Sequence, residues 1–325
     1  MNPIELELNQ IEVRLDYCYR LGSVANELEH SLKKYGILQP LVLVRDGGSG
    51  YFLIDGIKRW NFARQQKLSG IRAFVYPLAS LAEVYEGNLV LNEASGGLST
   101  AEKLLAVQKS RQLGESVQAS VLEITGLIKV KELPAILEWF RLLPVDMQIY
   151  LHESSAGLKW MARLRQYPFA EYHLWFELGR SLQFKARELA EILEQVLDIS
   201  LGKGVMPIQL YKLLAVKKNL DSGQTPQQKA QQLKKVVAEM RFPELSRINN
   251  EMQALARKVG KESKSLLSLQ WDPTLEKNNI LLTANLRTAG SVDHLKSVIE
   301  NKEFLHLIEK SLKTINELGD LTNDT

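Results

Sequence analysis

The chain has 325 residues, a formal net charge of +3, 45% hydrophobic residues and 24% charged residues, a composition typical of globular proteins. No apolar run reaches the roughly 18 residues that a membrane-spanning helix needs. The first residues lack the basic and apolar regions of a secretion signal. The single cysteine, Cys18, excludes an intramolecular disulfide and a cysteine zinc site, and the five histidines show no metal-ligand spacing. We therefore expect a cytoplasmic protein of two or more domains without a metal site.

Residues 1–98 alternate short strands and helices. In chain order the patterns predict a strand at 4–8, a helix ending at Gly36, a hairpin with strands at 41–44 and 51–54, a helix from Asp55-Gly56 to about Lys67, and a strand at 71–77. This order is typical of a small α/β domain.

The pattern changes at Ser99, where Glu102 follows three places later, as in a helix-capping box. From there to about residue 260 one helical pattern follows another, and Pro226 and Pro243 both stand where helices begin. The pattern of residues 265–325 predicts two strands followed by two helices. We therefore expect an α+β multidomain chain with a small α/β domain at 1–98, helical segments at 99–160 and 161–264, and a small α+β domain at 265–325.

Two cations, Lys58 and Arg59, open the helix that follows Asp55-Gly56. Cations are slightly disfavoured at the positive end of a helix dipole. A phosphate bound to the free amides of the first helical turn would explain them. The alternative is that Trp60 and Ala63 face the core while the two cations face water.

Positive charge is concentrated in residues 203–264, which contain 13 Lys and Arg against 5 Asp and Glu. This excess indicates a polyanion such as DNA as partner. The alternative is a set of solvated helix faces. The paired cations of this segment are Lys217, Lys218, Lys234, Lys235, Arg257 and Lys258.

Residues 28–77 resemble the ParB/sulfiredoxin-like family, also called the ParB-like nuclease domain. The resemblance rests on "SLKKYGILQPL" at 31–41, on "DGIKRWNFA" at 55–63 and, more weakly, on "EGNLVLNEASGGLSTAEKL" at 86–104. It implies a nucleotide site, with CTP and magnesium as the expected ligand. The nucleotide contacts that it implies fall on Gln39, Gly56, Lys58, Arg59 and Asn88.

The sequence departs from the family pattern at two of its motifs. The motif glutamate that the family uses in CTP hydrolysis is replaced by Ile57, and its Gln-Arg pair is replaced by Val90-Leu91. Loss of the carboxylate removes a general base or metal ligand, and loss of the arginine removes a phosphate clamp. We therefore expect a degenerate nucleotide switch rather than an enzyme, with no catalytic residue.

A weaker resemblance to the partition-protein type continues over residues 105–152, where the family has a helix-turn-helix. Gly126 falls near the expected turn, and "RLLPVDMQIYL" resembles the closing phrase. Lys129 and Lys131 precede the second helix and are expected to contact DNA phosphates. That helix is largely apolar, so its side chains are candidates for the core rather than for reading bases.

The sequence thus predicts a DNA-binding ParB-like protein in chromosome, plasmid or mobile-element maintenance. By resemblance, residues 265–325 are expected to form a homodimer. Two alternatives remain open from the sequence. One is a nucleotide-dependent phosphotransferase or nuclease on the same fold, and the other is a protein–protein adaptor with a decayed nucleotide site.

Overall fold

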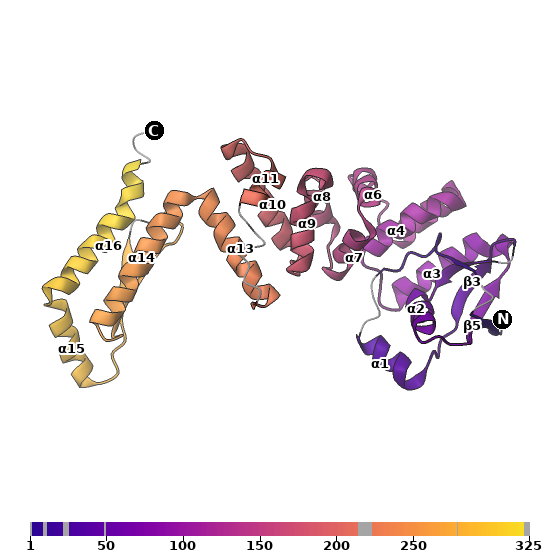
Figure 1. Cartoon of the computed structure of the whole chain (residues 1–325), viewed down its shortest axis with the longest axis horizontal. Coiled ribbons are helices and arrows are strands. Elements are labelled where there is room, and N and C mark those ends of the chain that lie inside the picture. Colours follow the sequence, from indigo (N-terminus) through magenta and orange to yellow (C-terminus); the bar gives the residue numbers. More distant parts are fainter. Residues whose placement is uncertain are drawn as a thin grey trace. The chain divides into compact units, whose positions relative to one another are not determined.

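The computed structural model describes residues 2–8, 12–21, 26–48, 50–213, 223–277 and 279–321 (Figure 1). The chain divides into two compact units. The first comprises Met1–Glu194 and Val205–Ala230, and the second comprises Gln195–Gly204 and Gln231–Thr325.

The first unit begins with a five-stranded mixed sheet. Its strands are β1 (Ile4–Glu7), β2 (Val13–Arg14), β3 (Leu41–Arg45), β4 (Tyr51–Asp55) and β5 (Gly70–Tyr76). They lie in the order β1-β5-β3-β4-β2. Strand β3 pairs antiparallel with β4 and parallel with β5. On the flanks, β1 pairs antiparallel with β5, and β2 pairs parallel with β4.

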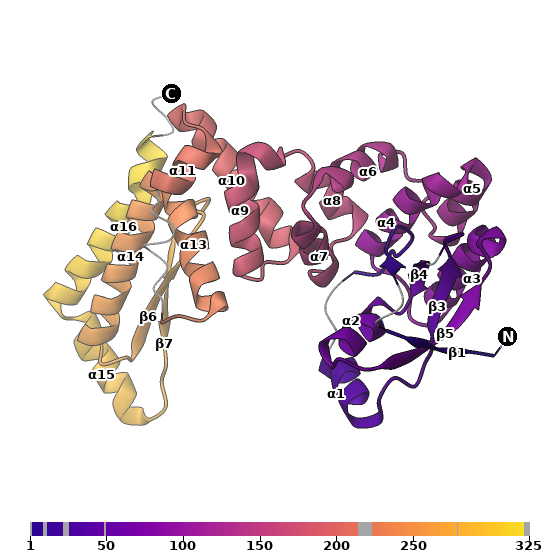
Figure 2. The same cartoon turned by 45° about the vertical axis from the view of Figure 1, so that its right-hand side comes forward.

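Helices cover both faces of this sheet (Figure 2). They are α2 (Ile57–Gln65) and α3 (Leu81–Ala94), the latter preceded by a 3₁₀ turn at Leu78–Ser80, while α1 (Asn26–Tyr35) lies against α2. Because side chains alternate between the faces of a strand, Leu43 and Leu53 share a core with Trp60 of α2. On the opposite face, Tyr17 packs edge-on against Phe52 and against Tyr85 of α3.

The rest of the first unit is helical. Its helices are α4 (Thr100–Ser110), α5 (Glu115–Ile124), α6 (Leu133–Leu142), α7 (Val145–Glu153), α8 (Leu158–Leu164), α9 (Phe169–Ser181), α10 (Ala186–Lys203), which ends in the second unit, and α11 (Pro207–Leu213), with a 3₁₀ turn at Arg111–Leu113. The capping box that the sequence predicts is present, since Ser99 accepts from the Glu102 amide and Glu102 accepts from the Ser99 amide. Phe140, Trp175 and Phe176 are almost fully buried.

The second unit is built on an antiparallel hairpin of β6 (Leu267–Trp271) and β7 (Ile280–Ala284). Its helices are α13 (Pro226–Arg241), which begins in the first unit, α14 (Pro243–Glu262), α15 (Ala289–Ile299) and α16 (Lys302–Leu321). Met252, Leu269 and Ile315 lie in its core.

The expected mixture is confirmed: a strand-and-helix N-terminal part is followed by a largely helical remainder. Cys18 is buried, and burial raises the pKa of its thiol to about 11. Within the described ranges, no helix is long and apolar enough to cross a membrane.

Candidate functional site

The turn between β4 and α2 requires a glycine. Gly56 caps α2 with a φ of 103°, in the left-handed region, and a Cβ added there would lie 2.5 Å from Leu41 Cδ2. No side chain caps α2, and its first turn has no acidic residue. The first amides of α2 therefore remain available to an anion.

Arg59 holds this turn together. Its Nη1 donates to the carbonyl oxygens of Gln39 (3.0 Å) and Pro40 (2.8 Å), and its Nη2 donates to Oδ2 of Asp55 (2.7 Å). The side chain is 14% exposed. The alternative in which Arg59 faces water is therefore wrong, because the guanidinium ties the start of α2 to the residues that enter β3.

Lys58 is the available cation of the same turn. It is partly exposed and makes no hydrogen bond or ion pair with any residue that the structure describes. Its positive charge is one of the causes that lower the pKa of His152 on α7. Gln39 is exposed and contributes its backbone carbonyl to Arg59.

Asn88 does not join this turn. It lies on α3 with 8% of its surface exposed, and its Nδ2 donates to the Tyr19 hydroxyl at 2.8 Å. Asn92, one helical turn later, donates to the same hydroxyl at 2.9 Å. The structure thus brings together Gln39, Gly56 and Arg59, places Lys58 beside them, and uses the Asn88 amide nitrogen in the core.

A second polar cluster, which the sequence reasoning missed, lies beside Lys58. Glu102 is 2% exposed, accepts from the backbone amides of Leu21 and Ser99 at 3.1 Å each, and lies 3.4 Å from Nε of Arg20. Nδ1 of His152 lies 2.7 Å from Oγ of Ser99 and 3.7 Å from Oε2 of Glu102. The signal for this cluster in the sequence was the capping box, read only as a helix start.

Burial favours a neutral imidazole at His152 and lowers its pKa. The negative charges of Glu102 and Glu153 oppose this shift, and the positive charges of Lys58 and Arg20 add to it. His152 thus lies among charges of both signs.

The helix-turn-helix-like segment consists of α5, a turn in which Gly126 has a φ of 71°, and α6. Lys129 and Lys131 are exposed in the connection before α6. On α6 most of the large apolar side chains are buried, namely Leu133, Ile136, Leu137, Trp139 and Phe140, whereas Leu142 at its end is 66% exposed. The exposed face carries the ion pair of Glu138 and Arg141, at 2.6 Å. The second helix therefore packs as core and offers few groups that could read bases.

The basic pairs of residues 203–264 are described only in part. Lys217 and Lys218 lie outside the described residues. On α13, Lys235 is exposed and lies 3.8 Å from Glu239. Lys234 of the same helix is partly buried, whereas Arg257 and Lys258 are both exposed on α14. All four belong to the second unit.

Comparison with known proteins identifies the N-terminal part. Residues 8–87 match the family model of the ParB N-terminal domain. This segment of the chain is therefore similar to ParB N-terminal domains. A curated relative, a probable chromosome-partitioning protein ParB of Pseudomonas putida strain KT2440, is 31% identical over 104 residues, which are 32% of this chain and 36% of the relative. A second Pseudomonas putida protein of the same description matches equally.

Two solved structures show low sequence identity and a low TM-score to this chain. A C-terminally truncated chromosome-partitioning protein ParB from Caulobacter crescentus, complexed with CTP-γ-S, has 20% identity and a TM-score of 0.25 over 52% of this chain and 94% of that one. A Pnob8-like ParB-N domain has 16% identity and a TM-score of 0.31 over 58% of this chain and 96% of that one.

The family match covers only part of the expected nucleotide site. The matched segment, residues 8–87, includes Gln39 and the turn from Asp55 to Arg59 but ends before Asn88. The chain spans 36% of the length of the curated relatives that it matches.

Proposed function

We propose that this chain is a DNA-binding ParB-like protein of chromosome, plasmid or mobile-element maintenance, with a nucleotide site that has become degenerate. The observation that carries this proposal is the ParB N-terminal domain at residues 8–87, together with 31% identity to a chromosome-partitioning relative. Exposed Lys129 and Lys131, and the excess of Lys and Arg over residues 203–264, support DNA as the partner.

The proposed mode of binding is contact with phosphates rather than with bases. The exposed lysines precede α6, whereas most apolar side chains of α6 are buried. Phosphate contacts fix position on the duplex but carry no sequence information. We therefore expect similar affinities for unrelated duplexes and a strong dependence on salt.

The turn at Gly56 fits a phosphate better than it fits a hydrolytic nucleotide site. The open amides of α2 and the side chain of Lys58 can hold an anion. Ile57 supplies no carboxylate for magnesium or for a water nucleophile, and Arg59 already has three internal acceptors. CTP with magnesium is therefore expected to bind weakly and not to be hydrolysed, and a phosphotransferase or nuclease role finds no catalytic group here.

Dimer formation through the second unit is also part of the proposal. Strand β7 is paired only with β6 in the described part of the chain, and Leu281 on it is 61% exposed. Leu305 and Leu312 of α16 are 45% and 40% exposed. An open strand edge with exposed apolar side chains is suited to pairing with a second copy.

The test of DNA binding uses a fluorescent generic duplex and three forms of the full chain. These are the natural protein, a Lys129→Ala, Lys131→Ala double variant, and a Lys313→Ala control from α16. Removal of two phosphate contacts should weaken binding to every duplex similarly and reduce the slope of log K against log salt by about two. Equal affinities for the double variant and the control would place the DNA contacts elsewhere.

A further inference from the structure

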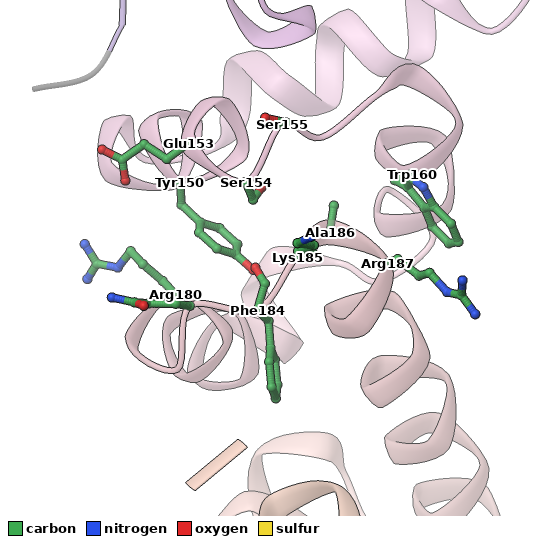
Figure 3. A pocket seen from close by; sticks show the side chains of 11 residues that line it. Tyr150, Glu153, Ser154, Ser155, Trp160, Arg180, Phe184, Lys185, Ala186 and Arg187 are labelled. Carbon is green, nitrogen blue, oxygen red and sulfur yellow. The ribbon is translucent and has the colours of Figure 1, made fainter. Parts of the chain in front are cut away.

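A cavity of about 620 Å³ lies among α7, α8, α9 and α10, away from the ParB N-terminal domain (Figure 3). This volume is within the range of roughly 300–1,000 Å³ typical of small-molecule sites. Its lining combines hydroxyls, cations and aromatic side chains, including Ser154, Trp160, Arg180, Lys185 and Arg187. None of the residues considered above for DNA or nucleotide contact belongs to it.

Trp160 gives the cavity an aromatic wall. It is partly exposed, with Nζ of Lys159 5.5 Å and Cζ of Arg163 5.8 Å from its ring centroid. Figure 3 shows Trp160 and Arg187 toward one side of the cavity and Arg180 toward the other. A planar base could therefore stack on a tryptophan that is flanked by Lys159 and by Arg163, the latter paired with Glu194.

The cations of the lining can respond to a phosphate. Lys185 is exposed and its ammonium has no ion-pair partner among the residues that the structure describes. Arg180 and Arg187 pair with Asp146 (2.9 Å) and Glu191 (2.7 Å), both in exposed pairs that contribute little to stability. A phosphate can compete for such guanidinium groups.

Two backbone positions beside the cavity have left-handed geometry. Ser155 and Gln183 have φ values of 53° and 56° just beyond the ends of α7 and α9. The Tyr150 hydroxyl donates to the carbonyl oxygen of Phe184 at 2.7 Å and so links α7 to the segment that follows α9.

Glu153 is the carboxylate among the described lining residues, and its charge opposes an anionic ligand.

From these observations we infer that this cavity binds one nucleotide unit of a single-stranded nucleic acid, with the base against Trp160 and the phosphate at Lys185. The site is independent of the turn at Gly56 and of Lys129 and Lys131. It adds a single-strand contact to a protein whose proposed partner is duplex DNA.

The test measures binding of the full chain to a fluorescein-labelled ten-nucleotide oligothymidylate at low salt, by anisotropy. Lys185→Ala should weaken binding about fivefold and Trp160→Ala about tenfold, whereas Trp160→Phe keeps part of the stacking surface. Glu153→Gln should strengthen binding, because it removes the opposing charge. Lys313→Ala is the matched control, and thermal unfolding of each variant checks that it folds.

Unlabelled competitors show whether the cavity binds a nucleotide within a single strand, a free nucleotide or phosphate alone. Unlabelled oligothymidylate should displace the probe better than thymidine monophosphate does, and an abasic oligomer of equal charge should compete poorly. Equal competition by the abasic oligomer would show a phosphate-only contact and would overturn the inference. So would oligothymidylate binding that is absent, or that is the same in Lys185→Ala, Trp160→Ala and the control. Failure here leaves duplex binding, which is measured separately, unaffected.

Discussion

At the scale of single residues, Arg59 shows how a motif position can serve the fold. An arginine at the start of a helix would be placed on the surface if only its neighbours in sequence were considered. Its three acceptors come instead from Asp55 and from the carbonyl oxygens of Gln39 and Pro40. Arg59, which the family resemblance assigns to nucleotide binding, thus ties the start of α2 to the end of β4 and to the residues before β3.

We therefore expect Arg59→Ala to lower the free energy of unfolding by about 2 kcal/mol or more, because hydrogen bonds to charged groups are lost and Asp55 loses its partner. Arg64→Ala, on the exposed end of the same helix, is the control and should change stability by less than about 0.5 kcal/mol. Chemical denaturation measures both. Equal stability of the two variants would mean that the internal bonds of Arg59 contribute nothing.

His152 makes stability depend on pH. Burial lowers its pKa in the folded state below the ordinary value of about 6.5. The unfolded chain therefore binds the His152 proton more readily than the folded chain does. The contribution of neutral His152 to stability is complete above pH 6.5 and is lost as the pH falls through the folded-state pKa. The groups around it are Glu102, Glu153, Lys58 and Arg20.

The expected result is a decrease in the free energy of unfolding of the natural protein between pH 7.5 and 5.5 that is smaller in His152→Gln. His173→Gln, on α9, is the control and should keep the full decrease. Denaturation curves at several pH values provide the comparison. Parallel pH profiles for all three proteins would rule out His152 as the titrating group.

At the scale of elements, α4 holds the segment 15–21 at both of its ends. Near its start, Glu102 accepts from the Leu21 amide, and near its end Nζ of Lys109 donates to the carbonyl oxygens of Leu15 (2.7 Å) and Asp16 (2.9 Å). The same Glu102 closes the capping box of the helix. One helix thus fixes its own N-terminus and the segment that carries Tyr17 and Tyr19.

Glu102→Ala should destabilise the first unit by about 2–3 kcal/mol, since it removes a helix cap and leaves the buried Leu21 amide without its acceptor. Glu102→Gln retains an acceptor for the cap and should be intermediate. Hydrogen exchange at the Leu21 amide reports the local effect. An unchanged exchange rate in Glu102→Ala would contradict the role of this side chain.

The open edge of the β6–β7 hairpin leads to a test of the proposed dimer. Leu281→Asp places a charge on the exposed side of β7 and should shift the protein toward monomer in analytical ultracentrifugation. Gln253→Asp, at an exposed position of α14, is the control and should leave the association constant within about threefold. A natural protein that is monomeric at all concentrations would exclude this surface as a dimer interface.

At the scale of the whole molecule, local patterns predicted most elements, because turn glycines, helix caps and alternating apolar residues act over a few positions. Two of the three acceptors of Arg59 lie 19 and 20 positions away, and the partners of His152 include Ser99, 53 positions away. Such contacts depend on tertiary packing, so no local pattern indicates them. The cavity beside Trp160 was missed for the same reason, since four helices build it.

The central claim is that this ParB-like chain binds DNA through phosphate contacts. The most direct test is an anisotropy titration of the full natural chain against a generic duplex at low and moderate salt, with and without CTP and magnesium. We expect the chain to bind the duplex with an affinity that falls steeply with salt, is similar for unrelated sequences and changes little with CTP. Absence of binding at low salt, with or without CTP, would contradict it.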